Sequence, residues 1–485
     1  MTTLRSLSIG SLLLSSMCML PGTASASYAS AQCSVDPAWI SSPSLPNEVK
    51  KSDADGTSNF CDFYQFSTQT FLYLMSPAGQ GDMRKFQVQA NYPVLESNSD
   101  GSPANSCDES VAGPTLRTSL AKDMSTGQAG GGATIYAQDG NVVYYDVRFN
   151  KSLCELTGSA VEMNSQNIVN FPGGTMELKF AWKKLSDSEI SGATFVTQKQ
   201  VISDKAETLG LVGMHIAVAT PNHPEFVWAT YEHKNNTPDC LPSNKNDNKN
   251  WMFSSESCAN GLPDSSSTAD ACKFNQPEKN LTDPTGTPTN ICRVFPYGTW
   301  SGDHEAGENL NDITQQNAQL LALLGEPGTA GSMKVLENYF TVGALWVTDI
   351  TKSSGGVGVP NERGSLRLAN TVAETDYQHV DLTSEFSGNC FGCHNYKGTS
   401  EAVSNNITSQ ALSHIFKDIK IGQGLDIDVT SSTVIADNSK AAAICGGDTK
   451  TKGVCAASSK HLKWNGNWTN INTSAGSVCG CTPSK

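Results

Sequence analysis

Two cysteines and a histidine occur within five consecutive residues late in the chain, as Cys390-Phe391-Gly392-Cys393-His394. Two thiols three positions apart can add to both vinyl groups of one porphyrin, and a histidine directly after them then lies below the iron as its proximal ligand. The spacing therefore predicts one covalent haem c, bound through Cys390, Cys393 and His394.

Two other interpretations of this motif stay open. Cys390 and Cys393 could form a structural disulfide beside an incidental histidine, or a thioredoxin-type redox pair. A redox pair normally begins a helix after a strand, whereas the polar residues Ser387-Gly388-Asn389 precede this motif. The sequence favours haem attachment over both alternatives.

The second axial ligand of such a haem is less determined. All 11 methionines precede residue 334, so the methionine that follows the attachment motif in small cytochromes is missing. We retain His414, in the stretch A-L-S-H-I-F, together with His215 and His233 as candidate ligands. Two histidine ligands lower the reduction potential relative to His/Met, whereas an open position permits peroxide or small-ligand chemistry.

His215 and His233 belong to one apolar segment, residues 211–236. Two strands joined across Pro221 to Pro224 would form a hairpin, with His215, Glu232 and His233 on neighbouring faces. Such residues could supply a haem ligand, a proton relay or a metal site. They could equally be hydrogen-bonded polar residues at a strand end.

A second group of residues with a recognisable chemistry lies near the C-terminus. Trp464 and Trp468 flank Asn465-Gly466, a pair typical of a tight turn. Indole faces beside amide donors suit stacking and hydrogen bonding to sugar rings. The alternative is a disulfide-stapled module whose tryptophans form its core.

The N-terminus and the cysteines both indicate export. Arg5, the apolar stretch 7–20 and the small residues Ala24-Ser25-Ala26 predict a signal peptide over residues 1–26. One of the 15 cysteines lies in this signal and two lie in the C-x-x-C-H motif, which leaves an even number for disulfides in an oxidising compartment. The sequence does not determine their pairing. We expect a periplasmic or extracellular protein.

Composition excludes several classes of protein. The 33 Lys and Arg residues against 47 Asp and Glu residues give a formal charge of −14, which argues against binding nucleic acid. After the signal, no apolar run is long enough to span a bilayer, so we expect a chain that is not membrane-spanning. The motifs of serine hydrolases, P-loop enzymes and zinc proteases are all missing from the sequence.

Patterns of hydrophobic residues predict an α+β fold of two parts. Alternation predicts strands over 85–94, 143–149, 176–182 and 338–348, and apolar spacing predicts helices over 63–75 and 311–325. These elements form a β-rich, haem-carrying body over residues 27–425, in which 240–292 is a long disulfide-stapled loop. Residues 426–485 form a small disulfide-stapled module.

The body resembles a group of exported bacterial proteins of the cytochrome c family over most of residues 50–420. The similarity rests on four strings in the same order: L-V-G-M-H-I, F-V-W-A-T-Y-E-H-K-N-N, L-R-L-A-N-T-V-A-E-T and N-C-F-G-C-H-N-Y. It implies a single covalent haem through Cys390, Cys393 and His394, and it implies little about a substrate.

The C-terminal strings K-W-N-G-N-W-T and S-V-C-G-C resemble the mannan-binding lectin module in its four-cysteine variant. The resemblance implies a small helix on an antiparallel sheet, with sugar contacts near Trp464, Asn465, Gly466, Asn467, Trp468 and Thr469. This chain departs from the pattern in having one copy instead of a tandem pair and in the wide spacing of Cys445 and Cys455. A single copy would bind weakly unless the protein oligomerises or the body also binds.

Together these features predict an exported monohaem c-type protein that transfers electrons to or from an unidentified redox partner. Its C-terminal module would target it to mannose-containing glycans. Two alternatives remain: a secreted glycan-binding protein with a structural C-x-x-C pair, and a haem peroxidase or oxygenase acting on a bound polymer.

Overall fold

The computed structural model describes most of the chain between residues 33 and 483. The described ranges are 33–79, 83–88, 91–92, 134–156, 171–202, 205–240, 250–260, 272–276, 287–349, 361–378, 389–394, 413, 425–428, 435–447, 453–458, 462–472 and 476–483. The predicted signal peptide lies outside them. Helices and antiparallel sheets both occur, which confirms the α+β class.

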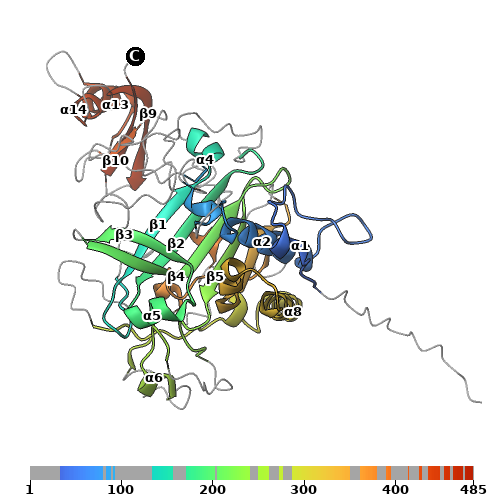
Figure 1. Cartoon of the computed structure of the whole chain (residues 1–485). Coiled ribbons are helices and arrows are strands. Elements are labelled where there is room, and N and C mark those ends of the chain that lie inside the picture. The colour runs from blue at the N-terminus through green and yellow to red at the C-terminus, as the bar shows by residue number, and fades with distance from the viewer. Residues whose placement is uncertain are drawn as a thin grey trace, which may run out of the picture. The chain divides into compact units, whose positions relative to one another are not determined.

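A seven-stranded antiparallel sheet forms the centre of the body (Figure 1). Its path is β1-β2-β4-β5-β6-β7, and β3 pairs with β4 off this path. The strands are β1 (Val143–Phe149), β2 (Met176–Lys184), β3 (Thr197–Ile202), β4 (Lys205–Val218), β5 (Val227–His233), β6 (Tyr339–Val347) and β7 (Glu362–Gly364). The expected hairpin is therefore present as β4 and β5, paired antiparallel.

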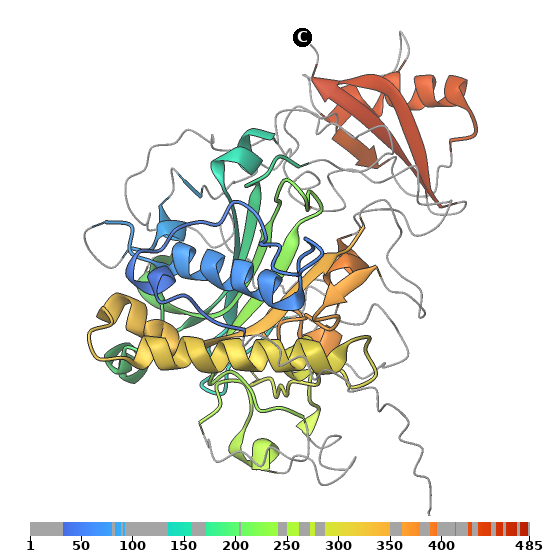
Figure 2. The same ribbon diagram turned by 90° about the vertical axis from the view of Figure 1, so that its right-hand side faces the viewer.

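Two long helices lie side by side across one face of this sheet (Figure 2). They are α2 (Phe60–Met75) and α8 (Ala306–Gly325), and a capping box between Asn59 and Asp62 begins α2. Phe71 of α2 stacks on Tyr231 of β5 at 4.0 Å between ring centroids. Aromatic stacking therefore fixes the helices on a sheet face that is apolar at alternate positions.

The strand expected over 85–94 is wrong, because residues 85–87 form the 3-10 helix η1 (Lys85–Gln87). The main-chain N–H of Arg84 donates to Gln87 Oε1 at 2.8 Å, and its guanidinium donates to the carbonyl of Met75 at 2.6 Å. These bonds satisfy the backbone within a turn and place Phe86 against Phe180 at 4.6 Å. The alternation of apolar residues in this segment therefore does not indicate a strand. It reflects the burial of one aromatic side chain, Phe86, in the core.

Short helices lie before, between and after the strands of this sheet. They are α1 (Ala38–Ser41), α4 (Lys151–Leu156), α5 (Asp187–Gly192), α6 (Glu256–Asn260), η2 (Pro296–Gly298), α9 (Gly331–Lys334), η3 (Val335–Asn338), η4 (Thr375–Gln378) and α10 (Cys390–Cys393).

The C-terminal residues form a second, three-stranded sheet. Its order is β8-β10-β9, and helical segments precede β9 along the chain. The elements are β8 (Leu425–Asp428), α13 (Asn438–Ala441), η5 (Ala442–Gly446), α14 (Val454–Ser458), β9 (Leu462–Asn472) and β10 (Gly476–Pro483). Its buried centre consists mainly of four cysteines. Disulfides thus supply much of the core that so short a segment lacks.

Ten of the twelve candidate cysteines pair in the structure. The disulfides are Cys33–Cys61, Cys240–Cys292, Cys258–Cys272, Cys445–Cys479 and Cys455–Cys481. Cys107 and the side chain of Cys154 lie outside the described residues. Disulfide formation, expected from the cysteine count, is therefore confirmed for the described part of the chain.

Candidate functional site

The C-x-x-C-H motif forms a capped helical turn that is tied to the edge of the sheet. The Asn389 side chain accepts a hydrogen bond from the Phe391 N–H at 2.8 Å and donates to Glu362 of β7 at 2.6 Å. The main-chain N–H of His394 donates to the carbonyl of Cys390 at 2.8 Å. Cys390 and His394 are half-buried, and the side chain of Cys393 lies outside the description.

An aromatic floor, formed by Trp228 with Phe149, Phe171 and Phe226, lies beneath this turn. Phe391 is 1% exposed and meets the Trp228 ring edge-on at 6.0 Å, while the His394 ring lies 4.7 Å from the same indole. Trp228 is on β5, on the face opposite α2 and α8, because Tyr231 and Ala229 of that strand face the helices. The cluster around Phe391 includes Phe149, Leu153, Phe171, Phe226, Leu345 and Leu368.

The indole N–H of Trp228 is buried and has no hydrogen-bond partner within the part of the chain that the structure describes. A buried donor without an acceptor costs about 1–3 kcal/mol. Such groups are rare in folded proteins and usually indicate a missing partner. The wall beside His394 therefore combines apolar rings with one hydrogen-bond donor, the Trp228 N–H, that has no partner among the described residues.

A row of polar side chains lies one step along the strands from Trp228. Lys179 pairs with His215 across β2 and β4, and His215 pairs with Thr230 across β4 and β5. Trp228 and Thr230 are two residues apart on β5, so their side chains share one face of the sheet. The register thus places Lys179, His215 and Thr230 beside the aromatic floor.

Glu374 joins this row from the following loop. Its carboxylate lies 3.2 Å from Lys179 Nζ and 2.8 Å from His215 Nε2, and it accepts the Asn370 N–H at 3.1 Å. Burial acts to raise the pKa of Glu374, but the charges of His215 and Lys179 outweigh it and hold the pKa at about 2. Glu374 is therefore an anionic centre at neutral pH.

The candidate axial ligands from the hairpin already have partners in this structure. His215 uses Nε2 toward Glu374 and Nδ1 toward the Thr230 hydroxyl. It would have to give up one of these contacts to bind iron. The geometry assigns His215 a hydrogen-bonding role beside the motif.

His233 is 0% exposed, and alternation along β5 directs it away from the face that carries Trp228. Its Nδ1 accepts the Asn235 N–H and its Nε2 donates to the Thr194 carbonyl, both at 3.2 Å. Burial lowers the pKa of His233 to about 3. His233 is thus a neutral core residue with both nitrogens occupied. His414 lies outside the described residues.

Glu232, which the sequence placed near these histidines, belongs to a buried ion-pair network. It accepts from Arg293 Nη2 at 2.5 Å and from the N–H and hydroxyl of Thr371 at 2.7 Å and 2.8 Å. These contacts occupy both carboxylate oxygens. Glu232 therefore has a structural role in this arrangement.

The C-terminal tryptophans contribute to the core of their module. Trp464 and Trp468 are half-buried against the disulfide cluster, and Trp468 Nε1 donates to Asn438 at 2.7 Å. The tight turn expected at Asn465-Gly466 is absent, because β9 continues through it. Gly466 instead adopts a φ of 94° near an irregularity in the pairing with β10. The side chains of Asn465, Asn467 and Thr469 lie outside the description.

Comparisons with protein-family models, curated proteins and solved structures find no match. None of the described helices is both long and apolar enough to cross a bilayer.

Sequence reasoning identified the motif but missed the residues that surround it. Trp228, Lys179 and Glu374 come from distant segments. Strand register places Lys179 near Trp228, and Glu374 joins them from the loop after β7. Trp228 lies inside the string F-V-W-A-T-Y-E-H, and its apolar neighbours give it the pattern of an ordinary core residue. No local signal distinguishes it from other buried tryptophans.

Proposed function

We propose that this chain is an exported c-type haem protein that transfers electrons, with one haem bound covalently through Cys390 and Cys393 and by His394. The observation that carries the proposal is the position of the C-x-x-C-H turn, which is capped and packed on an aromatic floor. When bound, haem c supplies reversible one-electron oxidation and reduction.

The described residues fit such a group in two respects. A porphyrin has an apolar ring system, and the cluster around Phe391 and Trp228 offers an apolar wall of matching chemistry. A haem also carries two carboxylates, and Lys179, in the polar row beside this wall, is a cation of the kind that pairs with carboxylates.

The chain's own residues would orient the proximal ligand. Asn389 and Glu362 hold the motif against β7, and the Trp228 indole restricts the orientation of the His394 ring. The apolar wall excludes water from that side of His394. These contacts favour a fixed histidine, because electron transfer proceeds best when the ligands do not rearrange.

The choice between electron transfer and a haem enzyme depends on the second axial position. His215 and His233 are already hydrogen-bonded at both nitrogens. Ser413, which directly precedes His414 in the sequence, donates to Glu177 of β2 at 2.5 Å. His414 is therefore the ligand that we propose to test first.

Export is supported by the disulfides. Five of them occur among the described residues, and disulfides persist mainly in oxidising compartments. Cytochromes c of bacteria also acquire their haem outside the cytoplasm. Periplasmic or extracellular localisation thus agrees with haem attachment.

The decisive experiment is a pyridine haemochrome spectrum of the full chain produced with a cytochrome c maturation system. We expect the α-band of a haem held by two thioether bonds and a mass increase of one haem. Cys390→Ser with Cys393→Ser should lose both signals, whereas Asn438→Ala in the C-terminal module should keep them. Colourless protein with both thiols free would refute the proposal.

We further propose that the C-terminal module attaches the protein to mannose-containing glycans. The support is the lectin-like sequence around Trp464 and Trp468, whose indoles keep part of their surface exposed. A glycan array with the full chain should show binding that Trp464→Ala reduces. Binding unaffected by Trp464→Ala, in a variant that keeps its disulfides, would assign these tryptophans to the module's core alone.

A further inference from the structure

Lys183 of β2 is the most deeply buried of the lysines and arginines that the structure describes, at 1% exposed. Alternation along the strand places its side chain on the same face as Ala181 and Leu185. Both belong to an apolar cluster that also contains Val143, the partner of Lys183 across β1. A cation in such surroundings is costly to remove from water, so its charge must be compensated locally.

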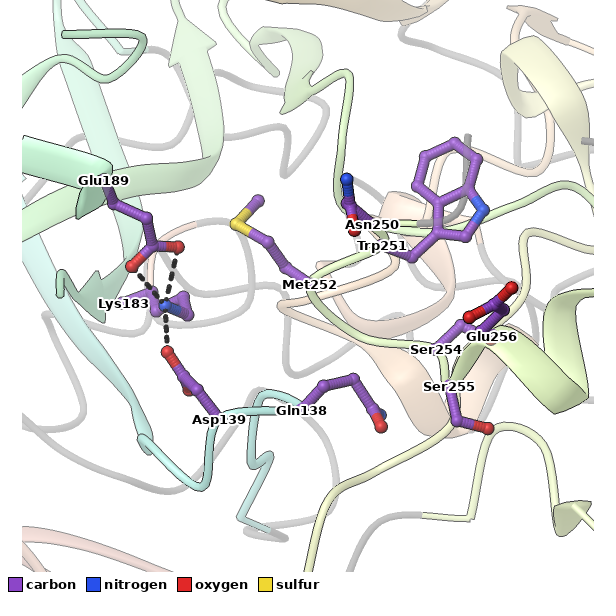
Figure 3. Close-up of a pocket in the computed structure, with 10 residues that line it drawn as sticks. All are labelled: Gln138, Asp139, Lys183, Glu189, Asn250, Trp251, Met252, Ser254, Ser255 and Glu256. Atoms are coloured by element: carbon purple, nitrogen blue, oxygen red, sulfur yellow. Dashed lines mark hydrogen bonds and ion pairs between the residues drawn. The ribbon is translucent and has the colours of Figure 1, made fainter. Parts of the chain in front are cut away.

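Two carboxylates from different segments meet the ammonium group of Lys183 (Figure 3). Asp139 comes from the turn before β1, and its Oδ2 lies 2.6 Å from Nζ. Glu189 comes from α5, and both of its carboxylate oxygens lie 2.9 Å from the same Nζ. One amine is therefore in direct contact with two acids.

The two carboxylates are held in different ways. Glu189 belongs to the capping box of α5 and accepts the Ser186 N–H at 2.8 Å, so its carboxylate is fixed beside the amine. Asp139 Oδ1 accepts the Asn141 N–H at 3.0 Å. The Asp139 side chain is also 36% exposed and lines a cavity of about 390 Å³, which has room for a released water molecule.

We propose that Lys183 and Asp139 form an intramolecular amide bond, with Glu189 as the proton carrier. Glu189 accepts a proton from the ammonium, and Nζ then attacks Cγ of Asp139. The negative charge gathers on Oδ1, where the Asn141 N–H stabilises it. Glu189 passes two protons in turn from Nζ to Oδ2, which leaves as water. One C–N bond forms and one C–O bond breaks, so an ammonium and a carboxylate become an amide and water without any further reagent.

Contact and burial both favour this product. Groups held in contact react as though their concentration were about 10⁵–10⁸ M, which offsets the preference of free amines and acids for the unlinked state in water. The amide is neutral, so it also removes a buried ion pair that is costly to desolvate. The neighbouring pair of Lys184 and Glu207 lies at a similar 2.8 Å, but Lys184 is 37% exposed, and water solvates its charge.

The test is mass spectrometry of the full mature chain after reduction, denaturation and digestion with trypsin. In most chains we expect the peptide that contains Lys183 to be joined to the peptide that contains Asp139, with a combined mass lower by one water. Trypsin should also fail to cleave after Lys183. An ion pair does not survive denaturation, so it cannot imitate this result. The proposal does not depend on haem attachment.

Three variants assign the roles of the side chains. Asp139→Ala should abolish the linkage and restore cleavage after Lys183. Glu189→Gln keeps the size of the side chain but removes the base, so it should slow the reaction by about a hundredfold or more. Glu207→Gln, at the exposed pair, should leave the linkage unchanged. The proposal is overturned if Lys183 of the parent chain is recovered with a free amine or is joined to another residue, or if freshly purified Glu189→Gln is linked as completely as the parent.

Discussion

The indole of Trp228 lies 4.7 Å from the imidazole of His394 at an angle of 40°, so the last residue of the C-x-x-C-H motif rests on the middle of the sheet. Trp228 belongs to β5, which is paired on both sides by β4 and β6. A ring on a doubly paired strand has little freedom to move. The orientation of His394 is therefore set by the most constrained part of the body.

Replacing the indole of Trp228 by a phenyl ring, which removes the N–H, should destabilise the haem-free protein little. Trp228→Phe keeps an aromatic ring against Phe391 and deletes a buried donor without a partner, so we expect the free energy of unfolding to stay within about 1 kcal/mol or to rise. Trp228→Ala opens a cavity in the same cluster and should cost about 3–5 kcal/mol. Denaturant titration of both variants measures the difference. Equal damage by both would show that the N–H has a partner.

Glu374 should make stability fall in acid. Its pKa in the folded protein is about 2, against an ordinary value of 4.5, so between these values the unfolded chain binds the extra proton. The stabilisation is complete above about pH 4.5 and is lost as the pH falls toward 2. Within that window this group alone lowers the free energy of unfolding by about 1.4 kcal/mol per pH unit.

Denaturant titrations across that range test the contribution of Glu374. Glu374→Gln should be less stable at neutral pH, because Lys179 and His215 lose their counter-charge, and its stability should depend less on pH below 4.5. Glu326→Gln, at an exposed site, should retain the parent's dependence. A parent-like acid profile in Glu374→Gln would contradict the role assigned to this carboxylate.

His233 should cause a second loss of stability on acidification, which begins at a higher pH than the loss caused by Glu374. Burial lowers its pKa from an ordinary 6.5 to about 3, so the folded protein holds it neutral while the unfolded chain is protonated. The free energy of unfolding is therefore greatest above about pH 6.5 and falls by about 1.4 kcal/mol per pH unit below it. His233→Gln, which removes the titrating ring, should flatten this region in denaturant titrations between pH 7 and pH 5. An unchanged slope would show that His233 does not cause the loss.

The parts of this fold that could be predicted are those in which one face of an element is buried. Val143, Tyr145, Val147 and Phe149 alternate because they share one face of β1, which packs in the core. The hairpin of β4 and β5 follows from its proline-rich connection. Residues 85–94 imitate the same alternation, but hydrogen bonds of Arg84 to Gln87 and Met75 hold a turn there. A two-residue period of hydrophobic residues in a sequence cannot reveal hydrogen bonds of this kind.

Only the part of the site formed by residues adjacent in the sequence could be predicted. Cys390, Cys393 and His394 are adjacent in the sequence, so their spacing carries the haem hypothesis by itself. Trp228 and Glu374 reach them through strand register and a loop, and those depend on pairing across the whole sheet. The lowered pKa of Glu374 likewise depends on His215 of β4 and Lys179 of β2.

The second axial ligand can be decided with two histidine variants of the matured protein. Since both nitrogens of His215 are hydrogen-bonded, to Glu374 and to Thr230, His215→Gln should leave the optical spectrum of the haem protein unchanged. His414→Ala should convert the spectrum to a high-spin form and allow carbon monoxide to shift the Soret band. Glutamine at position 215 can still donate to Glu374, so the variant keeps the anionic partner in place.

If His215→Gln gains carbon monoxide binding and His414→Ala does not, His215 leaves its hydrogen bonds to bind iron, and the polar row beside Trp228 rearranges on haem attachment. If the parent protein itself binds carbon monoxide, the axial position is open, and the peroxidase or oxygenase alternative replaces electron transfer.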